Sequence, residues 1–251
     1  MRTVVLIPAR YSSSRYPGKP LVKLLGKPMI LWVAELACRA VSKSDVFVAT
    51  DDDRIADAVT SAGFGVVMTS NTCLTGTDRL AEAAQEIDAD IFINVQGDEP
   101  LASADDILKI AKYKMQHMNV VVNGFSYVDK NEDPASVNIP KVVTTEDNKL
   151  VYMSRAALPA HKDEKCAPKR FKKQVCIYAF TKSELNRFYN FGRKSELEAS
   201  EDIEILRFLE LGSDIHMIET QSGSLAVDTP EDVAKVETAM RDKGYTESWL
   251  Q

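Results

Sequence analysis

The sequence predicts an α/β protein whose mostly parallel sheet carries an antiparallel extension in its second half. The first observation is a regular alternation of short apolar runs with amphipathic segments over residues 1–118. The second is a change of rhythm after residue 118, where several strand-like runs follow one another without a helix between them. The third is a length of 251 residues with 45% apolar and 27% charged residues, which suits an ordinary globular domain.

The first half is predicted to alternate between strands and helices. The run Thr3–Ala9 is short, rich in β-branched residues and followed at once by a polar loop, as expected of a buried parallel strand. Residues 28–41 then carry apolar side chains at helical spacing, with a proline suited to the first turn. The alternation continues with strands at 45–50, 65–69 and 91–95 and helices at 53–62, 77–87 and 103–117.

The second half has four strand-like runs before its helices return. Turn residues rather than helical periodicity separate these runs, which favours antiparallel pairing. Strands are expected at 119–128, 140–145, 149–154, 174–181 and 215–219, and helices at 182–190, at 201–211 and from Pro230 onward. Because the sequence has no internal repeat and no Gly/Ser linker, we expect residues 1–251 to form a single domain.

The charge balance excludes several classes of partner. The chain has 31 Lys and Arg against 37 Asp and Glu, a net charge of −6, so no basic field is available for nucleic acid or an anionic membrane. No apolar run reaches the roughly 18 residues of a spanning helix, and no cleavable leader is evident, so a cytoplasmic location is expected. The cysteines lack zinc-site spacing and are expected to be reduced structural thiols: Cys38, Cys73, Cys166 and Cys176.

The loop after the first strand is a candidate phosphate site. It places Arg10, Arg15 and Lys19 beside three serines and a glycine. Arginine can donate two parallel hydrogen bonds to a phosphate, lysine supplies a mobile charge, and backbone N–H groups can cradle the anion. The spacing matches neither the P-loop nor the dinucleotide fingerprint, and a solvated proline turn is the alternative. In a parallel sheet, loops 10–19, 51–54 and 96–100 should converge on one crevice.

A magnesium site is predicted from two acidic residues. The predicted strand 91–95 runs into Gln96, Gly97 and Asp98, and an acid beside a glycine at the end of a strand is a suitable place to hold Mg²⁺ on a phosphate. Because magnesium bound to a nucleotide usually takes one or two protein carboxylates, a second is sought, and Asp228 is the best choice. The alternative for Asp228 is a helix N-cap, although Thr229 could cap equally well.

Other polar segments are explained more simply. Thr77 and Asp78 are expected to cap a helix, whereas Arg79 in its first turn opposes the helix dipole and needs another favourable partner. In the segment 51–53, one acid is expected to cap the next helix and the others to be solvated. The sequence has no GxSxG motif, and its histidines are dispersed, so a hydrolytic triad is not expected: His117, His161 and His216.

Eight segments occur in the order found in one enzyme family: IPARYSSSRYPGKPL, GKPMI, VATDD, TGTDRL, INVQGDEPL, YMSRAALP, CIYAF and VDTPEDV. They resemble the CMP-Kdo synthetases (3-deoxy-manno-octulosonate cytidylyltransferases), within the CMP-sugar cytidylyltransferases. The resemblance implies a Rossmann-like nucleotidyltransferase fold, a homodimer, and Mg²⁺-dependent transfer of CMP from CTP to an acidic sugar in lipopolysaccharide or capsule biosynthesis. It also implies a CTP-binding part at about 1–118, an acceptor and dimerisation part at about 119–220, and a return to the core at 221–251.

The resemblance further implies residue roles. Catalytic roles fall to Arg10, Lys19 and Asp98, and the metal would be held by Asp98 and Asp228. The expected contacts with CTP include Ser13, Ser14, Arg15, Arg79 and Gln96. The expected contacts with the acceptor include Arg155, Gln174, Tyr178 and Glu204. The lysine-rich segment 162–173 is either a solvated loop or a cover over an anionic acceptor.

The chain departs from the family pattern in its acceptor half. Gln174, Val175 and Cys176 stand where a histidine, an apolar residue and a glycine are usual, and Ile205 replaces a glutamine. The segment VNIPKVV is also unusual. Loss of an amide would leave a polar substrate group unpaired unless another residue compensates.

Several acceptors and one other class therefore remain open. Kdo or 8-amino-Kdo is the expected acceptor. The alternatives are a sialic- or legionaminic-type ulosonic acid or a small phosphonate or phosphate compound. An inactive nucleotide-binding regulatory protein is the hypothesis from another class. A dinucleotide-dependent oxidoreductase is not expected, because the glycine fingerprint is missing.

Overall fold

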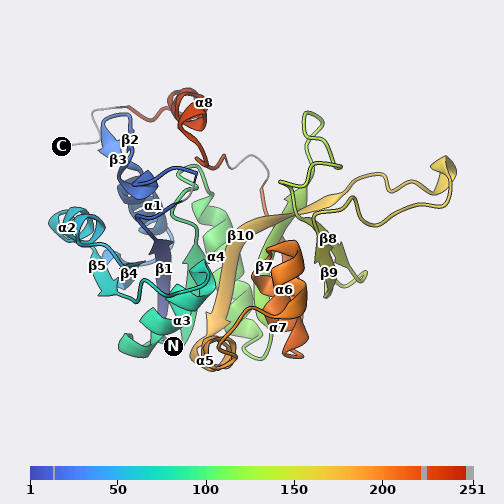
Figure 1. The fold of residues 1–251 in the computed structure, drawn as a ribbon, viewed down its shortest axis with the longest axis horizontal. Coiled ribbons are helices and arrows are strands. Elements are labelled where there is room, and N and C mark those ends of the chain that lie inside the picture. The colour runs from blue at the N-terminus through green and yellow to red at the C-terminus, as the bar shows by residue number, and fades with distance from the viewer. Residues whose placement is uncertain (14, 222–224, 247–251) are drawn as a thin grey trace.

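A computed structural model describes residues 1–13, 15–221 and 225–246 (Figure 1). Its main sheet is built from β1 (Thr3–Ala9), β4 (Val46–Thr50), β5 (Gly65–Met68), β6 (Ile91–Val95), β7 (Val121–Tyr127), β8 (Lys141–Thr144), β9 (Leu150–Ser154), β10 (Lys172–Thr181) and β11 (Ile215–Glu219). The strand order is β11–β7–β10–β6–β1–β4–β5, and the β8–β9 hairpin is attached through β10.

Strand directions divide the sheet into two parts. β1 is parallel to β4 and β6, β4 is parallel to β5, and β11 is parallel to β7. β10 lies antiparallel between β6 and β7, and its first residues also pair with β8. The structure therefore confirms the predicted mostly parallel sheet with an antiparallel extension.

Helices cover both faces of the sheet (Figure 1). They are α1 (Met29–Ala37), α2 (Asp53–Ser61), α3 (Gly76–Glu86), α4 (Ala104–Gln116), α5 (Lys182–Asn190), α6 (Glu196–Glu201), α7 (Ile205–Glu210) and α8 (Pro230–Asp242). Successive side chains of a strand point to opposite faces. Phe92 of β6 accordingly packs with α3, α5 and α7, whereas Ile91 and Ile93 pack with α1, α2 and α4. Within the described residues, no helix is both long and apolar enough to cross a membrane.

Several boundaries differ from the prediction. The helix predicted at 28–41 ends at Ala37, where short-range turns replace the regular helical hydrogen bonds. The helix predicted at 201–211 begins only at Ile205 as α7, and a separate short helix, α6, ends at Glu201, because Asp202 adopts a left-handed backbone conformation with φ of 52° between them. A hairpin of β2 (Lys23–Leu24) and β3 (Lys27–Pro28) was not predicted. Its two turn residues, Leu25 and Gly26, both have positive φ.

The N-cap of α3 also differs from the prediction. Thr75, rather than Thr77 or Asp78, caps this helix, and its hydroxyl accepts from the Asp78 N–H. Asp78 lies in the first turn, where a carboxylate interacts favourably with the helix dipole. The four cysteines are free thiols, as predicted: Cys38, Cys73, Cys166 and Cys176.

Candidate active site

A cavity of about 750 Å³ lies at the carboxyl ends of β1 and β6. Ala9 and Arg10 line it after β1, Gln96 and Gly97 line it after β6, and the first turn of α3 forms another wall. This is the position where open α/β sheets bind ligands. Nine of the residues predicted for the site line the cavity: Arg10, Ser13, Arg15, Lys19, Arg79, Gln96, Asp98, Arg155 and Glu204.

The two predicted metal ligands meet at one lysine. Lys19 Nζ lies 2.6 Å from Asp98 Oδ2 and 3.3 Å from Asp228 Oδ1. Arg15 also pairs with Asp228, at 3.0 Å. The loop before α8 is held beside β6 by a backbone bond from Val227 N–H to the Asp98 carbonyl at 3.0 Å. Segments distant in the sequence therefore bring the two carboxylates to one point.

Asp228 is not needed to cap α8. Thr229 forms a capping box with Asp232, whose carboxylate accepts from the Thr229 N–H at 2.9 Å. Asp228 thus keeps its carboxylate for Lys19 and Arg15. The N-cap alternative for Asp228 is therefore wrong, and its role in binding a metal stays a prediction.

The loop carrying the cations has a defined shape. Gly18 has φ of 71°, and a Cβ there would lie 3.1 Å from the Tyr11 ring. The Gly18 N–H also donates to the Tyr11 carbonyl at 2.8 Å. This turn places Lys19 at the start of a 3₁₀ helix, Lys19–Leu21, with its side chain only 13% exposed. Ser14, another predicted member of the loop, lies outside the described residues.

Gly97 is fixed by its close contact with β1. A Cβ at this position would lie 2.9 Å from the Pro8 carbonyl oxygen and 3.2 Å from Ile30 Cδ1. We expect Gly97→Ala to separate the ends of β1 and β6, lower the free energy of unfolding by about 1–3 kcal/mol and raise KM for the nucleotide. Urea unfolding and steady-state kinetics measure these effects. Wild-type values in both would show that the strand ends tolerate a methyl group.

Arg79 has a buried acidic partner. Its guanidinium is 4% exposed, donates to Asp51 Oδ2 at 3.0 Å and also contacts the Thr69 hydroxyl. The prediction that Asp51 is solvated is therefore wrong, because Arg79 reaches from α3 to the end of β4. Asp52 is the acid that caps α2, as it accepts from the Arg54 N–H at 3.0 Å. Asp51 thus fixes the arginine that lines the cavity.

Glu204 also lines the cavity, next to the first turn of α3. Its carboxylate accepts from the Gly76 and Thr77 N–H groups at 3.1 and 2.8 Å, and from the Thr77 hydroxyl. It therefore binds the N-terminus of α3, where a negative charge is favourable. Burial raises the pKa of Glu204, and the hydrogen bonds to Thr77 and Gly76 oppose this shift.

Arg155 also lines the cavity and is held in place by backbone carbonyls. Its guanidinium donates to the carbonyls of Glu201, Val137 and Asp202, the last two at 2.8 and 3.0 Å. These bonds use three of its five N–H groups. Two donors therefore remain for an anion in the cavity.

Gln174 and Tyr178 are joined by a hydrogen bond. The Gln174 amide donates to the Tyr178 hydroxyl and to Asn123 Oδ1, both at 3.1 Å, and Tyr178 is 4% exposed. Neither is among the cavity-lining residues in the described part of the chain. Their predicted contact with an acceptor stays a prediction.

Ile205 does not face the cavity. It is 1% exposed and packs in the apolar core with Leu206 and Phe208, because these residues form the buried face of α7. The expectation that this departure changes a surface facing the acceptor is therefore not met. Asn138, within the unusual VNIPKVV segment, does line the cavity.

The lysine-rich segment 162–173 projects beyond β8 and β9 (Figure 1). Its last residue, Lys173, pairs with Glu132 at 2.5 Å, and the Arg170 guanidinium lies 3.5 Å from the centroid of the Tyr127 ring. None of its described residues lines the cavity of the same chain. Within one chain the segment therefore does not line the cavity, and its last two residues, Lys172 and Lys173, are part of β10 rather than of a solvated loop.

Some cavity residues were missed by sequence reasoning. Thr75 could have been found as the N-cap of the TGTD segment. Lys194, Asp202 and Glu198 carry no local signal, because they line the cavity only through the tertiary fold. Cys73 also lines it, and burial, together with its bond to Glu82, raises the pKa of this thiol to about 12.

The fold and the cavity together define a nucleotidyltransferase-type α/β protein. Residues 4–215 match the family described as cytidylyltransferase. The chain is 35% identical to a solved CMP:2-keto-3-deoxy-manno-octonic acid synthetase complexed with CTP. The TM-score is 0.89, over 97% of this chain and 100% of that one.

Curated relatives agree with this match. The chain is 41% identical to the 3-deoxy-manno-octulosonate cytidylyltransferase of Geobacter metallireducens, over 94% of this chain and 96% of the relative. It is 42% identical to the 8-amino-3,8-dideoxy-manno-octulosonate cytidylyltransferase of Shewanella frigidimarina, over 94% and 98%. The chain belongs to the cytidylyltransferase family, and within it to the CMP-Kdo synthetases.

Proposed function

We propose that this protein transfers CMP from CTP to 3-deoxy-manno-octulosonate (Kdo) or its 8-amino analogue and releases diphosphate. The observation that carries the proposal is that Lys19 and Asp98 line the cavity with Arg10 and Arg15, and that Lys19 also contacts Asp228, which lies next to this lining. This group of cations and carboxylates suits a triphosphate and its metal ion. Relatives named for both acceptors support the choice of sugar.

Asp98 and Asp228 fit a magnesium ion. Their oxygens approach one point, marked by Lys19 Nζ, and Mg²⁺ prefers carboxylate oxygens. Among the described residues, no group of three or more His, Cys, Asp or Glu could hold a metal, so phosphate oxygens and water would complete the shell. Bound there, magnesium would neutralise charge on the phosphates and on the leaving diphosphate.

The residues on the CTP side act by positioning and charge neutralisation. Arg10, Arg15 and Lys19 would bind the triphosphate, while Ser13, Arg79 and Gln96 would contact the nucleotide. An acceptor hydroxyl gives up its proton to solvent, and its oxygen forms a bond to the α-phosphorus as the bond from that phosphorus to the bridging oxygen breaks. Diphosphate leaves with the bonding electrons, and no covalent intermediate on the protein is required.

The acceptor would bind in the part of the cavity lined by Arg155 and Glu204. The two unused donors of Arg155 suit the carboxylate of an ulosonic acid. Glu204 accepts hydrogen bonds from α3, and a further oxygen lone pair would be available to a sugar hydroxyl. Gln174 and Tyr178, which lie outside the described cavity lining, would contact the acceptor as the resemblance implies. The homodimer implied by the resemblance and the cytoplasmic location expected from the sequence remain part of the proposal.

Diphosphate release tests the acceptor directly. Purified protein with CTP and Mg²⁺ is given Kdo, 8-amino-Kdo, N-acetylneuraminate or a small phosphonate, and the products are identified by mass. We expect release with Kdo, its 8-amino analogue, or both. Release with N-acetylneuraminate or the phosphonate alone would show that another acceptor is used, and silence with every compound would favour a regulatory nucleotide-binding protein.

A further inference from the structure

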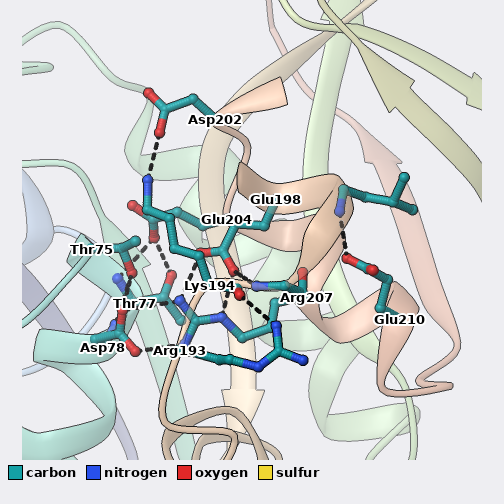
Figure 2. A network of polar contacts seen from close by, with 12 residues as sticks. Thr75, Thr77, Asp78, Arg193, Lys194, Glu198, Asp202, Glu204, Arg207 and Glu210 are labelled. Atoms are coloured by element: carbon teal, nitrogen blue, oxygen red, sulfur yellow. Dashed lines mark hydrogen bonds and ion pairs between the residues drawn. The ribbon is translucent and has the colours of Figure 1, made fainter. Parts of the chain in front are cut away.

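A buried network of charged side chains joins α3 to α6 and α7 (Figure 2). Arg207 of α7 donates through both terminal nitrogens to the Asp78 carboxylate, at 2.6 and 3.1 Å. It also donates to both oxygens of Glu198 on α6, at 2.6 and 2.7 Å. Arg207 is 0% exposed and Glu198 is 1% exposed, so the three charges interact with little solvent screening.

The network fixes the first turn of α3. Asp78 accepts from the Thr75 hydroxyl at 2.7 Å and is followed directly by Arg79, the buried cation that lines the cavity. Glu204 binds the N–H groups of Gly76 and Thr77 in the same turn. The turn that presents Arg79 is therefore held from α7 through Arg207 and, independently, through Glu204.

Arg207 is itself held in one orientation. The centre of its guanidinium lies 3.7 Å from the centroid of the Phe188 ring, and its planar fork is shared between two carboxylates. Glu198 is fixed in turn, because it accepts from the Ser195 N–H at 3.0 Å. A rigid group of this kind can transmit the position of α6 and α7 to α3.

Stability alone does not account for these buried charges. Replacing a complete buried ion group by uncharged residues of similar size is often neutral or stabilising, whereas removing one member is strongly destabilising. We propose that Arg207 is a positioning residue for CTP: through Asp78 it holds the first turn of α3 so that Arg79 meets the nucleotide. The inference rests on the proposed CTP site. It gives Arg207, which lies in the acceptor half of the chain, a role in binding the nucleotide.

The test removes the whole charged group at once. The triple variant Asp78→Asn/Glu198→Gln/Arg207→Met leaves no unpaired charge within the group, so it is expected to fold where Arg207→Met alone could fail. Calorimetric titration with CTP and Mg²⁺, without acceptor, is expected to give a Kd about tenfold above that of the wild type, which is a typical coupling between contacting groups. Wild-type affinity in this folded variant would overturn the proposal.

A matched control separates positioning from lost stability. Lys114 of α4 and Glu184 of α5 form another buried ion pair, at 2.7 Å, away from the cavity. The variant Lys114→Met/Glu184→Gln is expected to bind CTP with wild-type affinity, even if its Tm falls as far as that of the triple variant. An equal rise in Kd in this control would contradict a specific role for Arg207.

A second background tests whether the effect passes through Arg79. In Arg79→Gln protein, adding the triple substitution is expected to change the Kd for CTP by less than about twofold. A further tenfold rise in this background would contradict the proposed route. Transfer of CMP to Kdo is measured separately on the wild type: absence of transfer would count against the proposed function, while the binding comparisons would still decide the role of Arg207.

Discussion

Asp98→Asn is expected to lower kcat for cytidylyl transfer by about 10²–10³-fold, the cost of removing one group that stabilises developing charge. A neutral amide is a weaker ligand for Mg²⁺ than a carboxylate, and Lys19 loses its partner at 2.6 Å. CTP binding should weaken far less, because Arg10 and Arg15 still line the cavity.

Steady-state kinetics at several Mg²⁺ concentrations, with calorimetry for CTP, measure both effects of this substitution. Asp105→Asn is the control, because Asp105 is an exposed acid of the first turn of α4, outside the cavity lining. The control should keep wild-type kcat. Unchanged turnover in Asp98→Asn would eliminate Asp98 as a metal ligand.

Lys19→Met is expected to lower kcat/KM for CTP by about 10²–10³-fold. The substitution removes the ammonium that contacts both Asp98 and Asp228, so the phosphates lose a cation and the carboxylates face each other without one. Lys19→Arg keeps the charge and should recover part of the loss, but a planar guanidinium does not reproduce the compact ammonium between two acids.

The control for this second substitution is Lys23→Met, which removes an exposed lysine of β2 four residues further along the chain. We expect it to retain wild-type kcat/KM. Should Lys19→Met lose no more than this control, Lys19 would have no role in the phosphate site.

Local sequence patterns were sufficient to predict the positions of most strands of the sheet. β1 and β6 were predicted with their observed bounds, because short buried runs end there in polar loops. The break between α6 and α7 was missed, since it depends on the left-handed conformation of Asp202 rather than on an apolar pattern. The β2–β3 hairpin was also missed, because it is only two residues long on each side.

Candidate residues beside strand ends were found more readily than their partners. Arg10 directly follows β1 and Asp98 lies three residues after the end of β6, so sequence alone placed them at one edge of the sheet. The contact between Arg79 and Asp51, and the capping of α3 by Glu204, join segments far apart in the chain. No local pattern reports such contacts.

In the proposed reaction, an acceptor oxygen attacks the α-phosphorus of CTP. This attack is tested most directly by ³¹P NMR of a reaction containing CTP, Mg²⁺ and Kdo whose anomeric oxygen carries ¹⁸O. We expect one equivalent of diphosphate and a CMP-sugar phosphodiester with ¹⁸O in the bridge between phosphorus and sugar. A product whose bridging oxygen lacks the label, or the formation of CDP and phosphate instead, would contradict this mechanism.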